Sequence, residues 1–330
     1  MYMFKYILKR LGLMVMTFAI IVVICFILIR SLPIDFSVIP GQDADIIKQH
    51  YADLGFEVPG YPSKPMIVKL YLYLKNIFTK GDFGMISMLP AFRNRQVVDV
   101  FAEKLPKTIL INVYSTVFAV PIGIGLGIFA ALKKNKWQDQ AISTLVMVFI
   151  SVPSFVYAFL VQLLFCYYFK WFPLTMSSLR DAGNTYFSWT MFRSMIPAIL
   201  SLSFGSIAGY CRGTRAELTE VLTNDYMLLA RTKGLTKGQA TIRHALRNAM
   251  VPIFPSIIGE FVGVLSGSLI IEKIFAVQGV GGLYLNSITY QDNDLFMFLS
   301  AFYILIGLVA SIVVDISYGI IDPRIRMGAR

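Results

Sequence analysis

The dominant pattern along the chain is a series of six apolar runs separated by short polar connectors. The runs cover roughly 11–32, 106–132, 141–169, 194–214, 251–272 and 295–321. A helix needs about 20 residues to cross a hydrocarbon core of about 30 Å. Each run is long enough to do so. The pattern therefore predicts an all-α integral membrane protein with six transmembrane helices.

Two of the runs carry charges that bear on this interpretation. The first follows Lys5, Lys9 and Arg10, as a signal peptide would, but its apolar stretch is long and no small-residue cleavage site follows Arg30. That length favours a retained anchor over a cleaved signal. The fourth run is preceded by Arg193, and Arg212 and Arg215 lie at its end. Arginines near a helix end can extend toward the interface, so the fourth span is kept.

Composition supports a bilayer as the solvent. Of the 330 residues, 56% are hydrophobic and only 15% are charged, whereas a soluble domain has about 25% charged residues. The net charge of +11 could indicate nucleic acid, but the basic residues fall between the apolar runs. This distribution fits juxtamembrane anchoring against membrane lipid, and no nucleic-acid partner is expected. The three cysteines lie inside apolar segments and are interpreted as small hydrophobic residues.

Orientation follows from the basic connectors. Lysines lie between the second and third runs, and lysines and arginines lie between the fourth and fifth and after the sixth. The positive-inside rule then places both termini in the cytoplasm. The predicted organisation is an amino-terminal tail with the first helix, an extracytoplasmic loop, a core of the remaining five helices that contains a long cytoplasmic connector, and a cytoplasmic tail. The tail and first helix cover 1–32, and the extracytoplasmic loop covers 33–104. The core covers 105–321, with the connector at 216–250 inside it, and the cytoplasmic tail covers 322–330. A short helix at 66–78 is expected on the membrane surface.

Several kinds of chemistry are excluded by what the sequence lacks. No Gly-x-x-x-x-Gly-Lys-[Ser/Thr] motif occurs, so this chain is not expected to hydrolyse nucleotide. The two histidines, His50 and His244, both lie in connectors, which argues against a Ser–His hydrolase or a histidine-ligated metal. The run Pro121-Ile-Gly-Ile-Gly-Leu-Gly127 follows no predicted strand, so its small residues indicate close helix packing. No enzyme activity is predicted.

The connector between the fourth and fifth runs is unusually long. Asp225 can cap a short helix, and Gly234 lies where that helix needs a left-handed stop. Thr236 followed by Gln239 forms a capping-box pattern for a second helix, on which Arg243 is followed four residues later by Arg247. Two interpretations stay open on physical grounds alone. The helices rest on lipid headgroups, or they dock onto a cytoplasmic partner.

The same connector resembles that of a known family. The stretch Asp225-Tyr226 … Ala230-Arg-Thr-Lys-Gly-Leu235 … Arg243-His-Ala-Leu-Arg-Asn-Ala249 … Pro252 is similar to the cytoplasmic loop of ABC importer permeases. The similarity is greatest to the B-type permease of dipeptide and oligopeptide importers. Further matching pieces are Gly81-Asp-Phe-Gly84, Leu105-Pro106 with Thr108, Ile150-Ser-Val-Pro-Ser-Phe155, Arg212 and Arg215 with Glu220, Glu272 with Phe275, Gly279 and Gly281, and Asp322-Pro-Arg-Ile-Arg326.

The resemblance implies the type I ABC importer permease fold and a bacterial or archaeal cell membrane. It implies three kinds of partner: a second, C-type permease subunit, two ABC ATPase subunits, and an extracytoplasmic peptide-binding protein. ATP and Mg²⁺ would bind the ATPases, and this chain would hold no cofactor. It would form half of the pathway for di- or oligopeptides, with nickel chelates and glutathione as alternatives. Coupling to the ATPases would fall on Asp225, Ala230, Lys233, Gly234, Leu235 and Arg243.

A stand-alone secondary transporter is the alternative from another class. It would need buried ion-coupling groups and inverted repeats, and neither is clear in this sequence. Glu260 lies about nine residues into the fifth run, where a charged side chain costs roughly 2.5–3.5 kcal/mol. Such a residue usually faces a bundle interior or a wet cavity. Glu260, with Gln162 and Asn112, is therefore a candidate for the substrate pathway. The alternative is a carboxyl that is protonated or hydrogen-bonded to a neighbouring helix.

Overall fold

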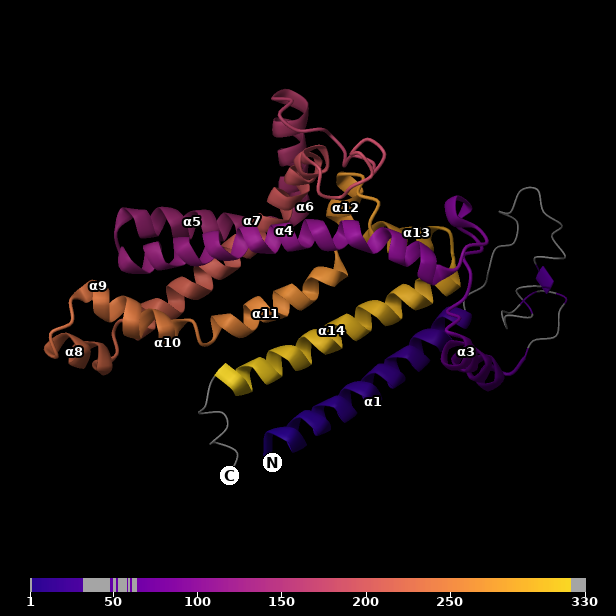
Figure 1. The fold of residues 1–330 in the computed structure, drawn as a ribbon, viewed down its shortest axis with the longest axis horizontal. Helices are drawn as coiled ribbons and strands as arrows, with labels where there is room; N and C mark the ends of the chain where they lie inside the picture. The colour runs from indigo at the N-terminus through magenta and orange to yellow at the C-terminus, as the bar shows by residue number, and fades with distance from the viewer. Residues whose placement is uncertain are drawn as a thin grey trace. The chain divides into compact units, whose positions relative to one another are not determined.

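The computed structural model describes residues 2–31, 48, 49, 52, 58, 60 and 64–321 of the chain. Most of these residues are helical, and among the described residues the only β contact is an isolated bridge between Met85 and Gln96. The helices run in the order α1 (Tyr2–Arg30), α3 (Met66–Lys80), η2 (Pro90–Phe92), α4 (Val97–Leu132), α5 (Trp137–Ser151), α6 (Ser154–Val161), η3 (Gln162–Tyr168), α7 (Trp189–Val221), α8 (Asp225–Thr232), α9 (Lys237–Ala240), η4 (Thr241–Leu246), α10 (Arg247–Ala249), α11 (Ile253–Gly263), η5 (Val264–Ser266), α12 (Leu269–Ile274), α13 (Val280–Thr289) and α14 (Asn293–Ile321) (Figure 1).

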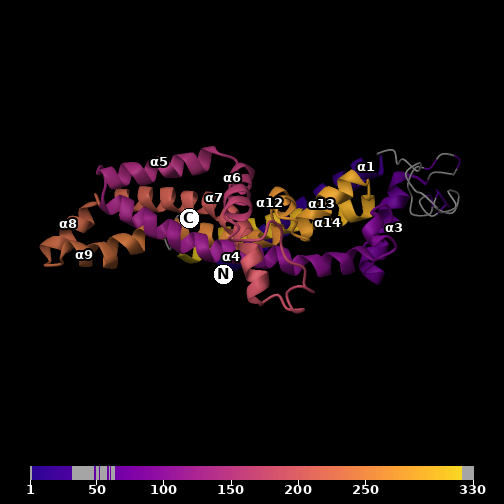
Figure 2. The ribbon, with the colours of Figure 1, turned by 90° about the horizontal axis from the view of Figure 1, so that it is seen from above.

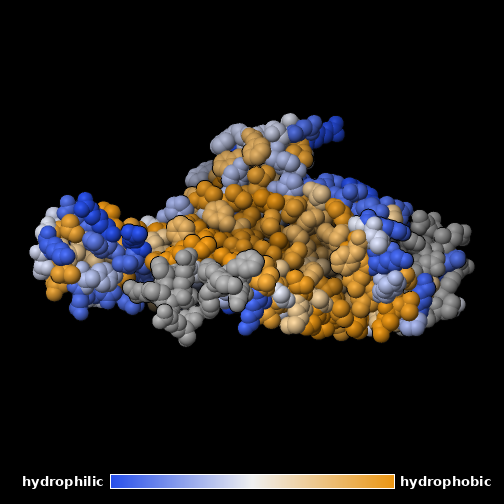
Figure 3. Space-filling view, turned by 60° about the horizontal axis from the view of Figure 1, so that its bottom comes forward, coloured by the Kyte–Doolittle hydropathy of each residue, from blue (hydrophilic) through white to orange (hydrophobic). Residues whose placement is uncertain are grey.

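Four of the described helices, α1, α4, α7 and α14, are long and apolar enough to cross a membrane. The pair formed by α5 with α6 and η3 passes the same test but is bent by 102°, which gives five spans if the pair crosses as one. Much of the surface that Figure 3 shows is hydrophobic, as lipid-facing side chains require. The all-α membrane class is confirmed, and the count of six spans stays a prediction.

Two of the predicted spans are not single helices. The run at 141–169 breaks at Val152, which is extended (φ −88°, ψ 127°) ahead of Pro153. The ring of a proline disfavours helical geometry in the residue before it, so the chain turns there. The run at 251–272 breaks after Gly263 into the 3₁₀ turn η5, and Gly267 follows with φ +66°. Both of these runs are therefore interrupted in the described structure.

The chain forms two compact units. The first comprises Met1–Pro106 and Val280–Leu308. Within it, Arg30 of α1 donates to Asp294 of α14 at 3.0 Å, and both side chains are buried. The Asp292 carboxylate accepts the backbone N–H groups of Ser87 and Met88, each at 2.8 Å. Burial raises the pKa of this carboxyl, against the opposing effect of the backbone donors.

The second unit comprises Lys107–Gly279 and Val309–Arg330. In it, α4, α5 and α7 lie side by side (Figures 1 and 2). A Cβ added at Gly123 would come within 2.8 Å of the backbone of Ile207, and one at Gly127 within 2.7 Å of the carbonyl oxygen of Cys211. The close approach of α4 to α7 therefore requires glycine at both positions, which confirms the packing interpretation of this glycine run.

A buried polar cluster in the second unit joins several pieces that the sequence presents far apart. The Thr108 hydroxyl on α4 donates to the Glu272 carboxylate on α12 at 2.9 Å, and both residues are buried. A Cβ at Gly267 or Gly279 would collide with these same two side chains. Thr108, Glu272 and Gly279, which the family resemblance singled out separately, thus form one packed contact.

Candidate functional site

The connector between α7 and α11 consists of two short helical segments that meet at a sharp turn. The first, α8, begins at Asp225, and its cap position is occupied by Asn224, whose side chain makes no capping hydrogen bond. Asp225 is therefore the first helical residue, and the expectation that it caps α8 was wrong. Its carboxylate still lies in the first turn, where negative charge is favourable to the helix dipole.

The turn between the two segments has the left-handed glycine that the sequence predicts. Gly234 adopts φ +92°, and its N–H donates to the carbonyl of Arg231 at 3.0 Å. The N–H of Leu235 donates to the carbonyl of Ala230 at 3.3 Å. These two bonds satisfy carbonyls at the end of α8, as a left-handed glycine does at many helix ends. Gly234 is thus confirmed as the helix stop.

The second helical segment opens with the predicted capping box. The Gln239 N–H donates to the Thr236 hydroxyl at 3.3 Å, and the Thr236 N–H donates to the Gln239 side-chain carbonyl at 3.0 Å. The segment continues as the π-helical η4 and then as α10. Because both its start and the preceding stop are fixed by local hydrogen bonds, the angle between the two segments is defined by the sequence of the turn.

One face of this connector packs against its own unit. Met227 and Ala230 of α8 are buried in a cluster with Leu218 and Val221 of α7. Ala240, Ala245 and Ala249 complete that cluster from the second segment. Ala230 therefore supports the loop from inside, and a large side chain at Ala230 would disrupt this packing.

The opposite face is open. Leu228, Leu229 and Ile242 are 64%, 55% and 70% exposed, and Asp225, Lys233, Gly234 and Arg243 are exposed beside them. Leu235 is half-buried. Exposed apolar side chains with cations around them are typical of a protein-binding surface. The sequence prediction missed Leu228, Leu229 and Ile242, although an apolar pair on the polar side of α8 was a usable signal.

The candidate pathway residues do not gather at one place. Glu260 of α11 accepts a hydrogen bond from the Ser206 hydroxyl of α7 at 2.7 Å and lines a groove of about 480 Å³. Gln162 donates to the carbonyl oxygens of Leu174 and Ile274, both at 3.0 Å. Asn112 donates to the carbonyl of Thr108 at 2.7 Å. Only Glu260 of the three lines this groove.

That groove is lined mainly by small and apolar residues, with two carboxylates among them. A second carboxylate, Glu217, also lines the groove. Tyr210 lines it too, and its hydroxyl donates to the Ser256 carbonyl at 3.3 Å. Gly209 and Gly213 also line it, and a Cβ at either glycine would meet nothing within 4 Å. These glycines therefore leave room in the groove and are not required for packing within the described chain.

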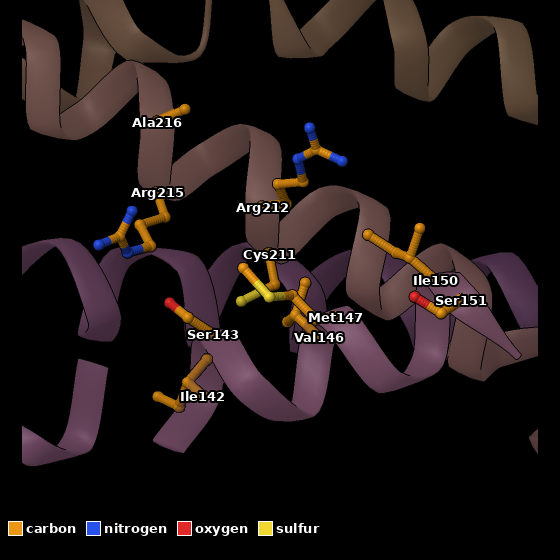
Figure 4. A pocket seen from close by; sticks show the side chains of 10 residues that line it. All are labelled: Ile142, Ser143, Val146, Met147, Ile150, Ser151, Cys211, Arg212, Arg215 and Ala216. Carbon is orange, nitrogen blue, oxygen red and sulfur yellow. The ribbon is translucent and has the colours of Figure 1, made fainter. Parts of the chain in front are cut away.

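A second groove, of about 420 Å³, lies between α5 and α7 (Figure 4). Arg212 and Arg215 line it from α7, opposite Ser143 of α5. Arg215 forms an ion pair with Asp139, which is buried on α5, at 2.5 and 2.8 Å. The positive charge of Arg215 near the end of α7 is thus paired with the Asp139 carboxylate. The helix α7 continues without a break to Val221.

Comparison with known proteins agrees with this architecture. Residues 123–327 match the family described as the binding-protein-dependent transport system inner membrane component. The chain is 33% identical to the dipeptide transport system permease protein DppB of Lactococcus lactis subsp. cremoris over 98% of its own length and 100% of that protein. It is 31% identical to the oligopeptide permease OppB of Haemophilus influenzae, over 98% and 100%, and to the glutathione permease GsiC of Escherichia coli K12, over 98% and 99%.

Similar solved structures include an amino acid ABC transporter (22% identity, TM-score 0.46, 67% of this chain and 94% of that chain). The MetNI methionine ABC transporter is also similar (14% identity, TM-score 0.49, 67% and 97%). From the family match and the full-length relatives, the chain belongs to the family of binding-protein-dependent transport system inner membrane components. It is a membrane permease component of an ABC transport system and works with the other components of that system.

Proposed function

We propose that this chain forms half of the transmembrane pathway of an ATP-driven importer of di- and oligopeptides. The observation that carries this proposal is the full-length similarity to permeases of dipeptide and oligopeptide transport systems. A C-type permease supplies the other half of the pathway. Two ATPase subunits bind ATP and Mg²⁺ and hydrolyse the nucleotide, and an extracytoplasmic binding protein delivers the peptide.

Glutathione is the second candidate substrate, because permeases of glutathione transport systems match this chain over the same length at 31% identity. Glutathione is itself a small peptide with free carboxylates and an ammonium group. A pathway that admits short peptides also fits its size and charge. The two candidates therefore differ in the specificity of the binding protein more than in the chemistry of this subunit.

The open face of the connector is the proposed contact with the ATPases. Leu228, Leu229 and Ile242 supply apolar area, and Lys233 supplies charge beside it. Because the other face is packed against α7, movement of the docked segment is transmitted directly to that membrane helix. Closure of the ATPase pair on ATP would thus change which side of the pathway is open.

The test is transport by the intact complex, isolated from native membranes through a tag on this chain and reconstituted in vesicles. We expect ATP-dependent uptake of labelled di- and oligopeptides that requires the binding protein. Glutathione in a parallel assay decides between the two substrates. Uptake driven by an ion gradient without ATP or binding protein would instead establish the secondary-transporter alternative.

A further inference from the structure

A cleft of about 650 Å³ lies at the junction of α8 with the second helical segment of the connector. Tyr226 lines it from α8, and Arg243, His244, Arg247 and Asn248 line it from η4 and α10. The Asn248 side-chain amide donates to the Tyr226 hydroxyl at 3.4 Å, which ties the two walls together. π-Helical turns such as η4 are uncommon and occur frequently at functional sites.

The cations in this cleft have no carboxylate partner among the residues that the structure describes. The ion pairs among the described residues of this unit do not involve Arg243, His244 or Arg247. Neither Asp225 of α8 nor Glu260 of α11, the acidic residues on either side of them in sequence, pairs with them. All three basic side chains are exposed. Two guanidinium groups four residues apart with an imidazole beside them are suited to bind a phosphate group.

The other residues of the cleft place it at the depth where membrane helices end. Val221 is the last residue of α7, and Ile321 is the last residue of α14. Val251 and Pro252 immediately precede the apolar helix α11. A cleft formed by the ends of two spanning helices and the start of another apolar helix lies at the level of the lipid headgroups.

We propose that this cleft binds the headgroup of an anionic phospholipid from the leaflet on which the connector lies. The phosphodiester contacts Arg243 and Arg247, with His244 and Asn248 as further hydrogen-bonding groups. The first acyl carbons pack on Val251, Pro252 and Ile321. A bound lipid would hold α8 against the second segment, so the lipid composition of the membrane would affect the geometry of the connector.

The apolar residues of the cleft distinguish this ligand from the alternatives. A free phosphate ion has nothing to place against Val251, Pro252 and Ile321, and an acidic protein segment would not require the cleft to lie where the helices leave the bilayer. Basic residues next to membrane helices attract anionic lipid with about 1 kcal/mol each. At about fivefold in affinity per kcal/mol, two arginines account for roughly a 25-fold preference.

The experiment measures lipid binding to the complex in detergent by native mass spectrometry, with phosphatidylglycerol and phosphatidylcholine as probes. We expect preferential retention of phosphatidylglycerol and a loss of roughly 25-fold in that preference for Arg243→Gln with Arg247→Gln. The matched control is Arg231→Gln with Lys237→Gln, which removes two exposed cations of the same connector that do not line the cleft. The control should stay within about twofold of the unmodified complex.

Each other outcome overturns the proposal. Equal retention of both lipids, or equal losses in the cleft variant and the control, would show that the cleft has no specific role. Inorganic phosphate that displaces the lipid at equal concentration would identify a free-anion site. Loss of the ATPase subunits from the cleft variant, with lipid retention unchanged, would show that the arginines contact the ATPase. None of these readouts depends on the transported substrate, so failure here leaves the peptide assignment standing.

Discussion

At the scale of single residues, Glu260 is the candidate pathway residue that lines a groove beside α7. Its carboxylate is held by the Ser206 hydroxyl of a neighbouring helix, so the hydrogen-bonded state expected as one alternative is present. It also lines a groove that Gly209 and Gly213 leave open. A carboxylate that lines an open groove can attract the ammonium group of a peptide. Its charge is therefore the property to remove.

We predict that Glu260→Gln keeps the complex assembled but lowers the initial rate of peptide uptake several-fold. The glutamine carbonyl can still accept the hydrogen bond from Ser206, so only the charge is lost. Ser206→Ala is the matched control, because it removes the hydrogen bond and retains the carboxylate. Uptake rates in vesicles are the measurement. Unchanged rates across several peptides would leave Glu260 a structural hydrogen-bond partner only.

The ion pair between Asp139 and Arg215 gives a prediction about stability. Asp139 is buried and accepts from the Asn135 N–H at 2.9 Å as well as from the guanidinium. Removing one partner of a buried pair leaves an uncompensated charge. Because the Arg215 side chain is 33% exposed, we expect Asp139→Asn to cost about 2 kcal/mol, below the usual range for fully buried pairs.

The measurement is the thermal unfolding midpoint of the detergent-solubilised complex. Arg215→Gln alone should also lower it, and the double variant should lose less than the sum of the two single losses. Asp181→Asn, which changes an exposed aspartate in a connector, is the control and should have little effect. Strict additivity would mean that Asp139 and Arg215 do not stabilise each other.

At the scale of elements, local chemistry was predictable and tertiary packing was not. The helix stop at Gly234 and the capping box of Thr236 and Gln239 depend only on residues a few positions apart. Both could therefore be predicted from the sequence. The burial of Ala230 depends on Leu218 of α7, which no local pattern reveals. The break at η5 was missed because hydrophobic runs look alike in a continuous and in an interrupted helix.

The turn between α8 and α9 provides the element-scale prediction. Valine at Gly234 must adopt φ near +92°, which costs a β-branched residue of order 1–3 kcal/mol and shifts the two segments. We predict that Gly234→Val leaves the chain in the membrane at near-normal levels. Stimulation of ATP hydrolysis by peptide-loaded binding protein should fall sharply, because the docking face is displaced.

Gly238→Val is the matched control, since Gly238 is exposed in α9, has no positive φ and has open space around its Cβ position. Stimulated ATP turnover in vesicles and co-purification of the ATPase subunits are measured together for both variants. If Gly234→Val retains its ATPases and full stimulation, the connector is a surface helix pair and does not couple the subunits.

At the scale of the whole molecule, the class of protein could be predicted from the sequence more completely than the internal geometry could. Apolar content and run length indicated a membrane protein, and scattered pieces such as Thr108, Glu272 and Gly279 indicated the family. In the structure these three residues, which are widely spaced in the sequence, pack together. Neither the bend at Val152 nor the grooves beside α7 followed from hydropathy, because both depend on how helices meet.

The orientation of the chain in the membrane is the remaining whole-molecule prediction. It rests on the basic residues between apolar runs, since lysine and arginine near helix ends are retained on the cytoplasmic side. Lys64, Lys134 and Gly238 are all exposed, so a cysteine at each can react with a soluble reagent. Replacing Cys25, Cys166 and Cys211 first removes the native thiols.

We predict that a membrane-impermeant maleimide applied to intact cells labels Lys64→Cys and leaves Lys134→Cys and Gly238→Cys unlabelled. Inverted membrane vesicles should give the opposite result, which also controls for the reactivity of each site. The reason is that under the proposed function the connector with Gly238 contacts the ATPases, where ATP is available, and the segment 33–104 lies on the opposite side of the membrane. Labelling of Gly238→Cys from outside intact cells would place the connector in a compartment without ATP, and the proposed coupling would then be impossible.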